Sequence, residues 1–228
     1  MLDVIPITLW PEISINTMRD KVRFQRIRTV VETRSKSQTF LKRKKMKLLI
    51  KDLERILNCK IRRDFKSIGF DTAKRTGICW LDVDKTHIVF DWCFIETEGL
   101  GNHKLIYKAM VEKFSEIIGG QDLAVVEQVF VGFSRAGSVE LARYSSFVIS
   151  ECIHHKVPYE LISATSARSK LEIKTVKGKS KESVANWLRQ NLKLELKDED
   201  ISDAIVLALL GIIDGMDFRS QVAIKKDK

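Results

Sequence analysis

Four carboxylates that lie far apart in this sequence have the chemistry of a site for a divalent cation. Glu127 interrupts a run of apolar residues, and Asp71 ends a short apolar segment. Asp200 and Asp203 are three residues apart, so on a helix they project from one face. Because burying an unpaired carboxylate is costly, we expect each acid at a strand end or a helix start, beside a cation or water.

Carboxylate oxygens are the ligands that Mg²⁺ prefers, usually together with water and a substrate phosphate. Two such ions about 4 Å apart can activate a water molecule and stabilise the leaving oxygen when a phosphodiester bond is cleaved. We therefore predict a Mg²⁺ site, in which Mn²⁺ would substitute, and no small-molecule cofactor. Simpler interpretations exist for single acids: Asp71 as a turn residue, and the acids at 198–200 as a complement to a helix dipole.

The cysteines add no second kind of site. Cys59, Cys79, Cys93 and Cys152 are widely separated and form no Cys-x-x-Cys pair. This spacing argues against zinc and predicts reduced, mostly buried thiols in a reducing compartment. The cytoplasm of a bacterium or of a phage-infected host is the simplest setting, with an organelle as the alternative. The longest apolar runs are shorter than the roughly 20 residues that span a bilayer, so we expect a soluble protein with no membrane partner.

The charge of the chain suggests a polyanionic partner and is unevenly distributed. The formal net charge is +10. Residues 1–66 contain 18 Lys and Arg against 7 Asp and Glu, a net charge of +11, which leaves −1 for residues 67–228. We therefore divide the chain into a basic N-terminal extension, 1–66, and a domain over 67–228 that carries the four acids.

The extension is predicted to be mainly helical. Apolar residues recur at steps of three and four between Met46 and Leu57, which is typical of an amphipathic helix. The preceding cluster Lys42-Arg43-Lys44-Lys45 has two interpretations. It is either the solvated approach to a helix packed on the core or an arm that contacts phosphates.

The elements expected after residue 66 alternate in type. β-branched and aromatic residues predict three adjoining strands, over 67–71, 76–83 and 86–95. Further strands are expected over 122–130 and 158–163, and helices over 103–118, 138–155, 181–192 and 200–213, with the type of 166–175 left open. This order predicts a mixed α/β sheet with helices on both faces. Functional groups in such sheets gather at strand ends and helix starts, where the four acids are expected.

Several segments, in this order along the chain, resemble the RuvC family of Holliday-junction resolvases. They are Val126-Glu127-Gln128-Val129-Phe130, the helix from Ser138, the loop 175–181 and Asp200-Ile201-Ser202-Asp203-Ala204. Gly69-Phe70-Asp71, followed by Thr76-Gly77, is similar to the first-strand motif of that family. The resemblance spans about residues 67–213 and implies the ribonuclease H-like fold.

The resemblance also implies a function for the acids. It implies a Mg²⁺-dependent endonuclease that cuts branched DNA at four-way junctions and leaves 5′-phosphate and 3′-hydroxyl ends. Its catalytic metal ligands would be Asp71, Glu127, Asp200 and Asp203. Lys181 matches a basic residue that lies near the scissile phosphate in that family. The helix after the Glu127 strand forms the dimer interface of the family, so a homodimer is expected through 138–150.

Other residues are expected to contact DNA. Phe130 matches an aromatic residue that the family uses against unpaired bases, although the residue type alone favours a place in the core. The predicted phosphate contacts are Lys74, Arg75, Arg135, Lys174, Lys177 and Lys179. The chain departs from the family pattern after Asp71, where the turn is one residue shorter and lacks Pro-Gly, and Lys174 is offset by one position.

Three other functions are compatible with parts of this pattern. One is another ribonuclease H-like nuclease, which would act on RNA–DNA hybrids or cut strands as transposases do. Another is a branched-DNA-binding module without turnover. A third, an ATPase of the sugar-kinase type, also uses an early strand Asp, but the glycine-rich phosphate loops that it needs are missing from the second half.

Overall fold

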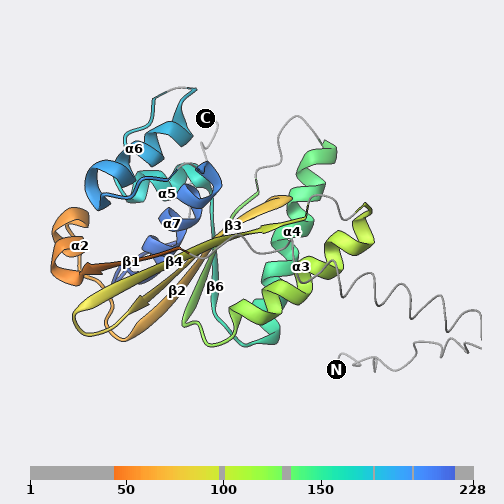
Figure 1. Cartoon of the computed structure of the whole chain (residues 1–228), viewed down its shortest axis with the longest axis horizontal. Helices are drawn as coiled ribbons and strands as arrows, with labels where there is room; N and C mark the ends of the chain where they lie inside the picture. The colour runs from red at the N-terminus through yellow and green to blue at the C-terminus, as the bar shows by residue number, and fades with distance from the viewer. Residues whose placement is uncertain (1–43, 98–100, 130–134, 177, 197, 219–228) are drawn as a thin grey trace, which may run out of the picture. The chain divides into compact units, whose positions relative to one another are not determined.

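A six-stranded mixed sheet organises the described part of the chain, in the strand order β1-β4-β3-β2-β5-β6 (Figure 1). The computed structural model describes residues 44–97, 101–129, 135–176, 178–196 and 198–218. The strands are β1 (Lys44–Leu49), β2 (Phe65–Asp71), β3 (Arg75–Val83), β4 (His87–Glu96), β5 (Leu123–Glu127) and β6 (Tyr159–Ile162).

The sheet is antiparallel over β1, β4, β3 and β2 and parallel over β2, β5 and β6. Because β2 and β5 are parallel, their C-terminal ends lie at the same edge of the sheet. Phe70 of β2 is in register with Val126 of β5. Each of these residues is followed by an acid, so the register sets Asp71 and Glu127 side by side.

Helices cover both faces of the sheet (Figure 1). They are α2 (Ile50–Leu57), α3 (His103–Ile118), α4 (Arg135–His154), α5 (Ala164–Lys170), α6 (Ser180–Leu192) and α7 (Glu199–Ile212). One hydrophobic core joins α3 and α4 to one face of the sheet, and a second joins α2, α5, α6 and α7 to the other. The predicted mixed α/β sheet with helices on both faces is confirmed.

Close packing of α7 on the sheet depends on two strand glycines. A Cβ atom on Gly69 of β2 would overlap the backbone of Ala204 and Ala208. A Cβ atom on Gly77 of β3 would likewise overlap the backbone of Asp200. Because only hydrogen atoms separate the two backbones here, the first turns of α7 lie directly against the strand that ends at Asp71.

The elements after residue 66 largely follow the predictions, whereas the N-terminal helix needs a correction. We predicted one helix over 46–57, but residues 46–49 belong to β1 and the helix begins at Ile50. Met46 and Leu48 are half-buried between exposed neighbours, a period of two that fits a strand. Pairing with β4 decides between the two periods, because it supplies backbone partners from Lys44 to Leu49.

The two elements before residue 67, β1 and α2, thus pack on the same sheet as the acids. Of the basic cluster at 42–45, Lys44 and Lys45 lie on β1, and Lys45 is 3.6 Å from Asp91. Residues 1–43 of the predicted extension lie outside the described residues. Within the described ranges, no helix has both the length and the apolar composition needed to cross a membrane.

Candidate active site

Asp71, at the end of β2, is the buried centre of a group of four acids. Glu127 ends the neighbouring strand β5, and Asp200 and Asp203 lie in the first two turns of α7. Burial, a hydrogen bond with the Glu127 side chain, and the charges of Glu127, Asp203 and Asp200 raise the pKa of Asp71 to about 9. The shift follows from bringing four like charges to one place with little water. The structure therefore brings together the acids that the sequence singled out.

The short turn after Asp71 is fixed by hydroxyl groups. The Thr76 hydroxyl donates to the Ala73 carbonyl oxygen at 2.7 Å. The hydroxyls of Thr72 and Ser145 of α4 are hydrogen-bonded at 2.7 Å, and both residues are buried. These bonds hold the end of β2 against α4, in a turn that lacks the Pro-Gly of the family pattern.

A largely buried arginine that we did not predict neutralises Asp203. Nη2 of Arg168, on α5, donates to both Asp203 carboxylate oxygens, at 2.9 and 3.0 Å. The two side chains are only 11% and 9% exposed. Arg168 falls in 166–175, the segment whose type the sequence left open, and the pair joins residues 35 positions apart, so periodicity gave no signal for it.

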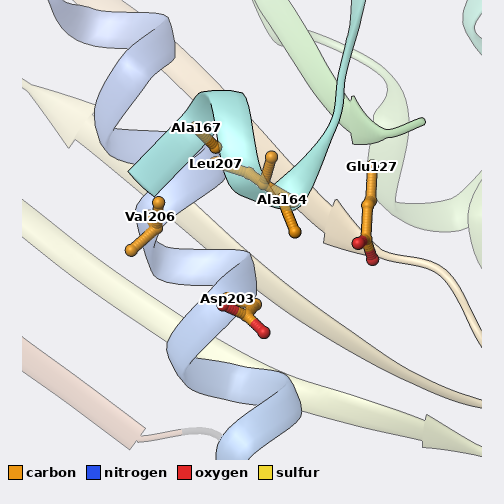
Figure 2. A pocket seen from close by; sticks show the side chains of 6 residues that line it. All are labelled: Glu127, Ala164, Ala167, Asp203, Val206 and Leu207. Carbon is orange, nitrogen blue, oxygen red and sulfur yellow. The ribbon is translucent and has the colours of Figure 1, made fainter. Parts of the chain in front are cut away.

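A small cavity separates Asp203 from Glu127. It has a volume of about 10 Å³, roughly the space of one water molecule. Glu127, Ala164, Ala167, Asp203, Val206 and Leu207 line it. Figure 2 shows the Glu127 side chain on β5 and the Asp203 side chain on α7, with Ala164 of α5 above the space between them.

Asp200 has cations on two sides. Lys181 Nζ, from the first turn of α6, is 3.1 Å from Asp200 Oδ1, and Arg75 Nη1 is 3.8 Å from Oδ2. Burial lowers the pKa of Lys181, but the hydrogen bond with Asp200 and the charges of Asp71 and Asp203 outweigh it and raise the pKa above its ordinary value. Lys181 therefore stays positively charged next to the acids at neutral pH.

Arg75, which we predicted as a phosphate contact, is engaged within the protein. Its guanidinium carbon lies 3.7 Å from the centre of the Phe94 ring, and Nη1 is 2.6 Å from Asp198 Oδ2. Asp198 also caps α7 by accepting a hydrogen bond from the Asp200 amide at 3.2 Å. The simpler interpretation of the acids at 198–200, a complement to a helix start, is thus correct for Asp198.

Two solved structures resemble this architecture. A RuvC of Thermus thermophilus in complex with a Holliday-junction substrate is 16% identical to the chain, covers 64% of this chain and 90% of its own, and has a TM-score of 0.54. A second Thermus thermophilus RuvC structure, also 16% identical, covers 64% and 92% with a TM-score of 0.53. The chain has a RuvC-like fold. No protein-family model and no curated protein matches it.

The RuvC-like fold is ribonuclease H-like, as the sequence resemblance implied, and at 16% identity the likeness establishes the fold alone.

The remaining predicted DNA contacts lie in different surroundings. Lys74, Lys174 and Lys179 are exposed, Arg135 begins α4, and Phe130 and Lys177 lie outside the described residues. Lys179 is 3.4 Å from Glu182. A contact of these residues with DNA stays a prediction.

The chemistry of the four acids fits a hard divalent cation, because all of their donor atoms are oxygen. In the described part of the chain, however, no three acidic, His or Cys side chains already stand around a common point suited to a metal ion. The contacts explain why: both oxygens of Asp203 face Arg168, and those of Asp200 face Lys181 and Arg75. A cation would therefore have to compete with these basic groups.

Proposed function

We propose that this chain is an endonuclease that resolves four-way DNA junctions by metal-dependent hydrolysis of phosphodiester bonds. The observation that carries the proposal is the group of four acids at one edge of a RuvC-like sheet, with Asp71 buried at its centre. The Thermus thermophilus RuvC was solved with a Holliday-junction substrate, which makes branched DNA the first ligand to test. A role in DNA recombination or repair would follow.

The acids and Lys181 would have separate tasks in this reaction. Asp71, Glu127, Asp200 and Asp203 would hold Mg²⁺, which supplies an activated water and stabilises the leaving oxygen. Lys181, 3.1 Å from Asp200, would stabilise the charge that develops on the scissile phosphate. The products would carry 5′-phosphate and 3′-hydroxyl ends.

Symmetric cutting of a junction needs two such sites related by a two-fold axis, which a homodimer provides. The exposed face of α4 supports this part of the proposal. Val139 is 51% and Ile153 is 63% exposed, and between them lie the exposed small residues Ala142 and Ser146. These four residues follow one another at spacings of three, four and seven, so they lie on one face of the helix, and we call them the α4 stripe. The α4 stripe would be buried between two copies.

The test is a cleavage assay on an immobile four-way junction, with and without Mg²⁺, comparing wild type with Asp71→Asn. We expect Asp71→Asn to lose at least 100-fold in cleavage rate, because the substitution removes a metal ligand. It should bind the junction as the wild type does, because it removes no positively charged side chain. Asp82→Asn, an exposed aspartate on β3, is the matched control. Wild-type cleavage by Asp71→Asn would refute the assignment.

A second candidate is a branched-DNA-binding module without turnover. It is favoured by the basic groups that already neutralise Asp203 and Asp200. Such a module would bind junctions with a steep salt dependence and give no Mg²⁺-dependent product. Comparing a junction, a linear duplex and an RNA–DNA hybrid in the same assay also separates a resolvase from another ribonuclease H-like nuclease.

A further inference from the structure

The contact between Arg168 and Asp203 has the geometry of a cation held by a carboxylate. A single nitrogen, Nη2, lies 2.9 Å from Oδ1 and 3.0 Å from Oδ2, so it stands between the two oxygens. That is where a metal ion chelated by Asp203 would also stand. The two cations exclude each other from this position.

The burial of the pair makes this competition stronger than the one at Asp200. The Arg168 side chain is 11% exposed, whereas the Lys181 side chain is 46% exposed and is screened by water. Asp203 itself is only 7% exposed and adds to the negative charge felt by Asp71. Lys181 also feels the charge of Asp203, but the two hydrogen bonds given for the Asp203 carboxylate both come from Arg168.

The guanidinium is nevertheless incompletely bonded. Its Nε is buried and has no hydrogen-bond partner within the described residues. A buried donor without a partner is unfavourable, so the arrangement with Asp203 does not satisfy the whole guanidinium group. Ala164 and Ala167, which lie on the same helix as Arg168, line the small cavity that Asp203 also lines. The Arg168–Asp203 ion pair thus includes an unsatisfied donor, Arg168 Nε, and borders a small cavity at Asp203.

We propose that Arg168 is an internal counter-cation that occupies Asp203 until a divalent metal ion binds, so that metal binding and release of the guanidinium are coupled. This inference rests on the proposed metal site and adds a residue that tunes its affinity. Arg168 acts through Asp203, as a positioning residue. It stabilises the metal-free fold and weakens metal binding at the same time.

The first test measures Mn²⁺ binding to the full chain by electron paramagnetic resonance, for wild type and Arg168→Met. Methionine keeps a long side chain but offers neither a positive charge nor an oxygen ligand. We expect Arg168→Met to bind Mn²⁺ at least tenfold more tightly, and Arg168→Lys to bind close to wild type. Arg189→Met, on the exposed face of α6, makes the same charge change away from the site and should leave the affinity unchanged.

Equal or weaker Mn²⁺ binding by Arg168→Met would overturn the inference, since Arg168 would then be structural or would help to hold the metal. Failure of the proposed function looks different: wild type and all variants would bind no Mn²⁺, or Asp203→Asn would bind it as wild type does. In the Asp203→Asn background, Arg168→Met should no longer raise the affinity.

A second measurement on wild-type protein keeps the inference testable should Arg168→Met not fold. With arginine labelled by ¹⁵N, the Nη protons of Arg168 should exchange slowly with water when metal is absent, because the guanidinium is buried and ion-paired. Saturation with Mg²⁺ should increase their exchange at least tenfold. Unchanged exchange at saturating Mg²⁺ would show that the ion pair persists and would refute the coupling.

Discussion

Single side chains in the acid group differ in what balances their charge. Asp203 is paired with Arg168, and Asp200 with Lys181 and Arg75, whereas burial, followed by the neighbouring acids, raises the pKa of Asp71. The hydrogen bond between Asp71 and Glu127 therefore requires a proton, which the raised pKa of Asp71 supplies at neutral pH. Asp71 is the residue whose charge the metal-free fold tolerates least.

This arrangement predicts how Asp71 affects stability as the pH changes. Because its pKa is raised to about 9 in the folded state, the fold holds a proton that the unfolded chain loses above its ordinary value of 3.8, so stability falls as the pH rises between these values. In EDTA at pH 8, Asp71→Asn should unfold at a temperature about 3 °C higher than wild type, roughly 1 kcal/mol.

The gain should shrink as the pH is lowered towards 3.8, because the unfolded chain then increasingly binds the same proton. Thermal unfolding followed by circular dichroism at several pH values measures it. A less stable Asp71→Asn at pH 8 would mean that the acids are not crowded as described.

At the scale of helices and strands, some elements follow from the local sequence pattern and others only from tertiary packing. The strands at 67–71, 76–83 and 86–95 and the helix at 103–118 were predictable, because β-branched runs and helical periods act locally. The strand at 44–49 was not, since its apolar spacing fits both periods until β4 supplies partners. Lys174 and Lys179 could be placed near a loop, but their distance to the acids is a tertiary property.

The same limit applied to the site. Asp71, Glu127, Asp200 and Asp203 were recognisable because acids in apolar surroundings are unusual and their order resembles a known family. Arg168 was not recognisable, because an arginine in a polar segment is ordinary in a sequence. Only the packing of α5 against α7 turns it into the partner of Asp203.

The close approach of α7 to β2 makes Gly69 the element-scale test. Gly69→Ala would place a methyl group into the backbone of Ala204 and Ala208, which cannot move as a side chain can. We expect a loss of about 1–3 kcal/mol in the free energy of unfolding. Gly119→Ala is the control, because its Cβ atom would meet only the His155 ring at 3.5 Å, an ordinary contact.

Urea denaturation monitored by tryptophan fluorescence gives both free energies. If Gly69→Ala were as stable as Gly119→Ala, α7 would not lie as close to the sheet as the structure has it. The position of Asp200 and Asp203 next to Asp71 would then need another explanation.

At the scale of the whole molecule, the α4 stripe is the surface that the proposed homodimer would use. Val139 and Ile153 lie at its two ends and are more than half exposed. Replacing both with Asp should produce a monomer, because two charges would be buried at the interface. Light scattering after size-exclusion chromatography measures the mass, and mapped cuts on a junction should change from paired to single nicks.

Leu49→Asp is the control for this experiment, since Leu49 is 49% exposed on β1, away from α4. It should leave the molecular mass and the paired cuts as in wild type. A dimer that survives both substitutions on α4 would place the interface elsewhere on the molecule.

The order of the acids along the chain has a consequence for protein synthesis. Asp71 emerges from the ribosome early, but Asp200 and Asp203 belong to α7, the last described helix. A nascent chain therefore exposes its first acids without the pair that would complete the group. The proposed activity would begin only after α7 has docked on the sheet, which would keep an unfinished molecule from cutting DNA in the cell that is making it.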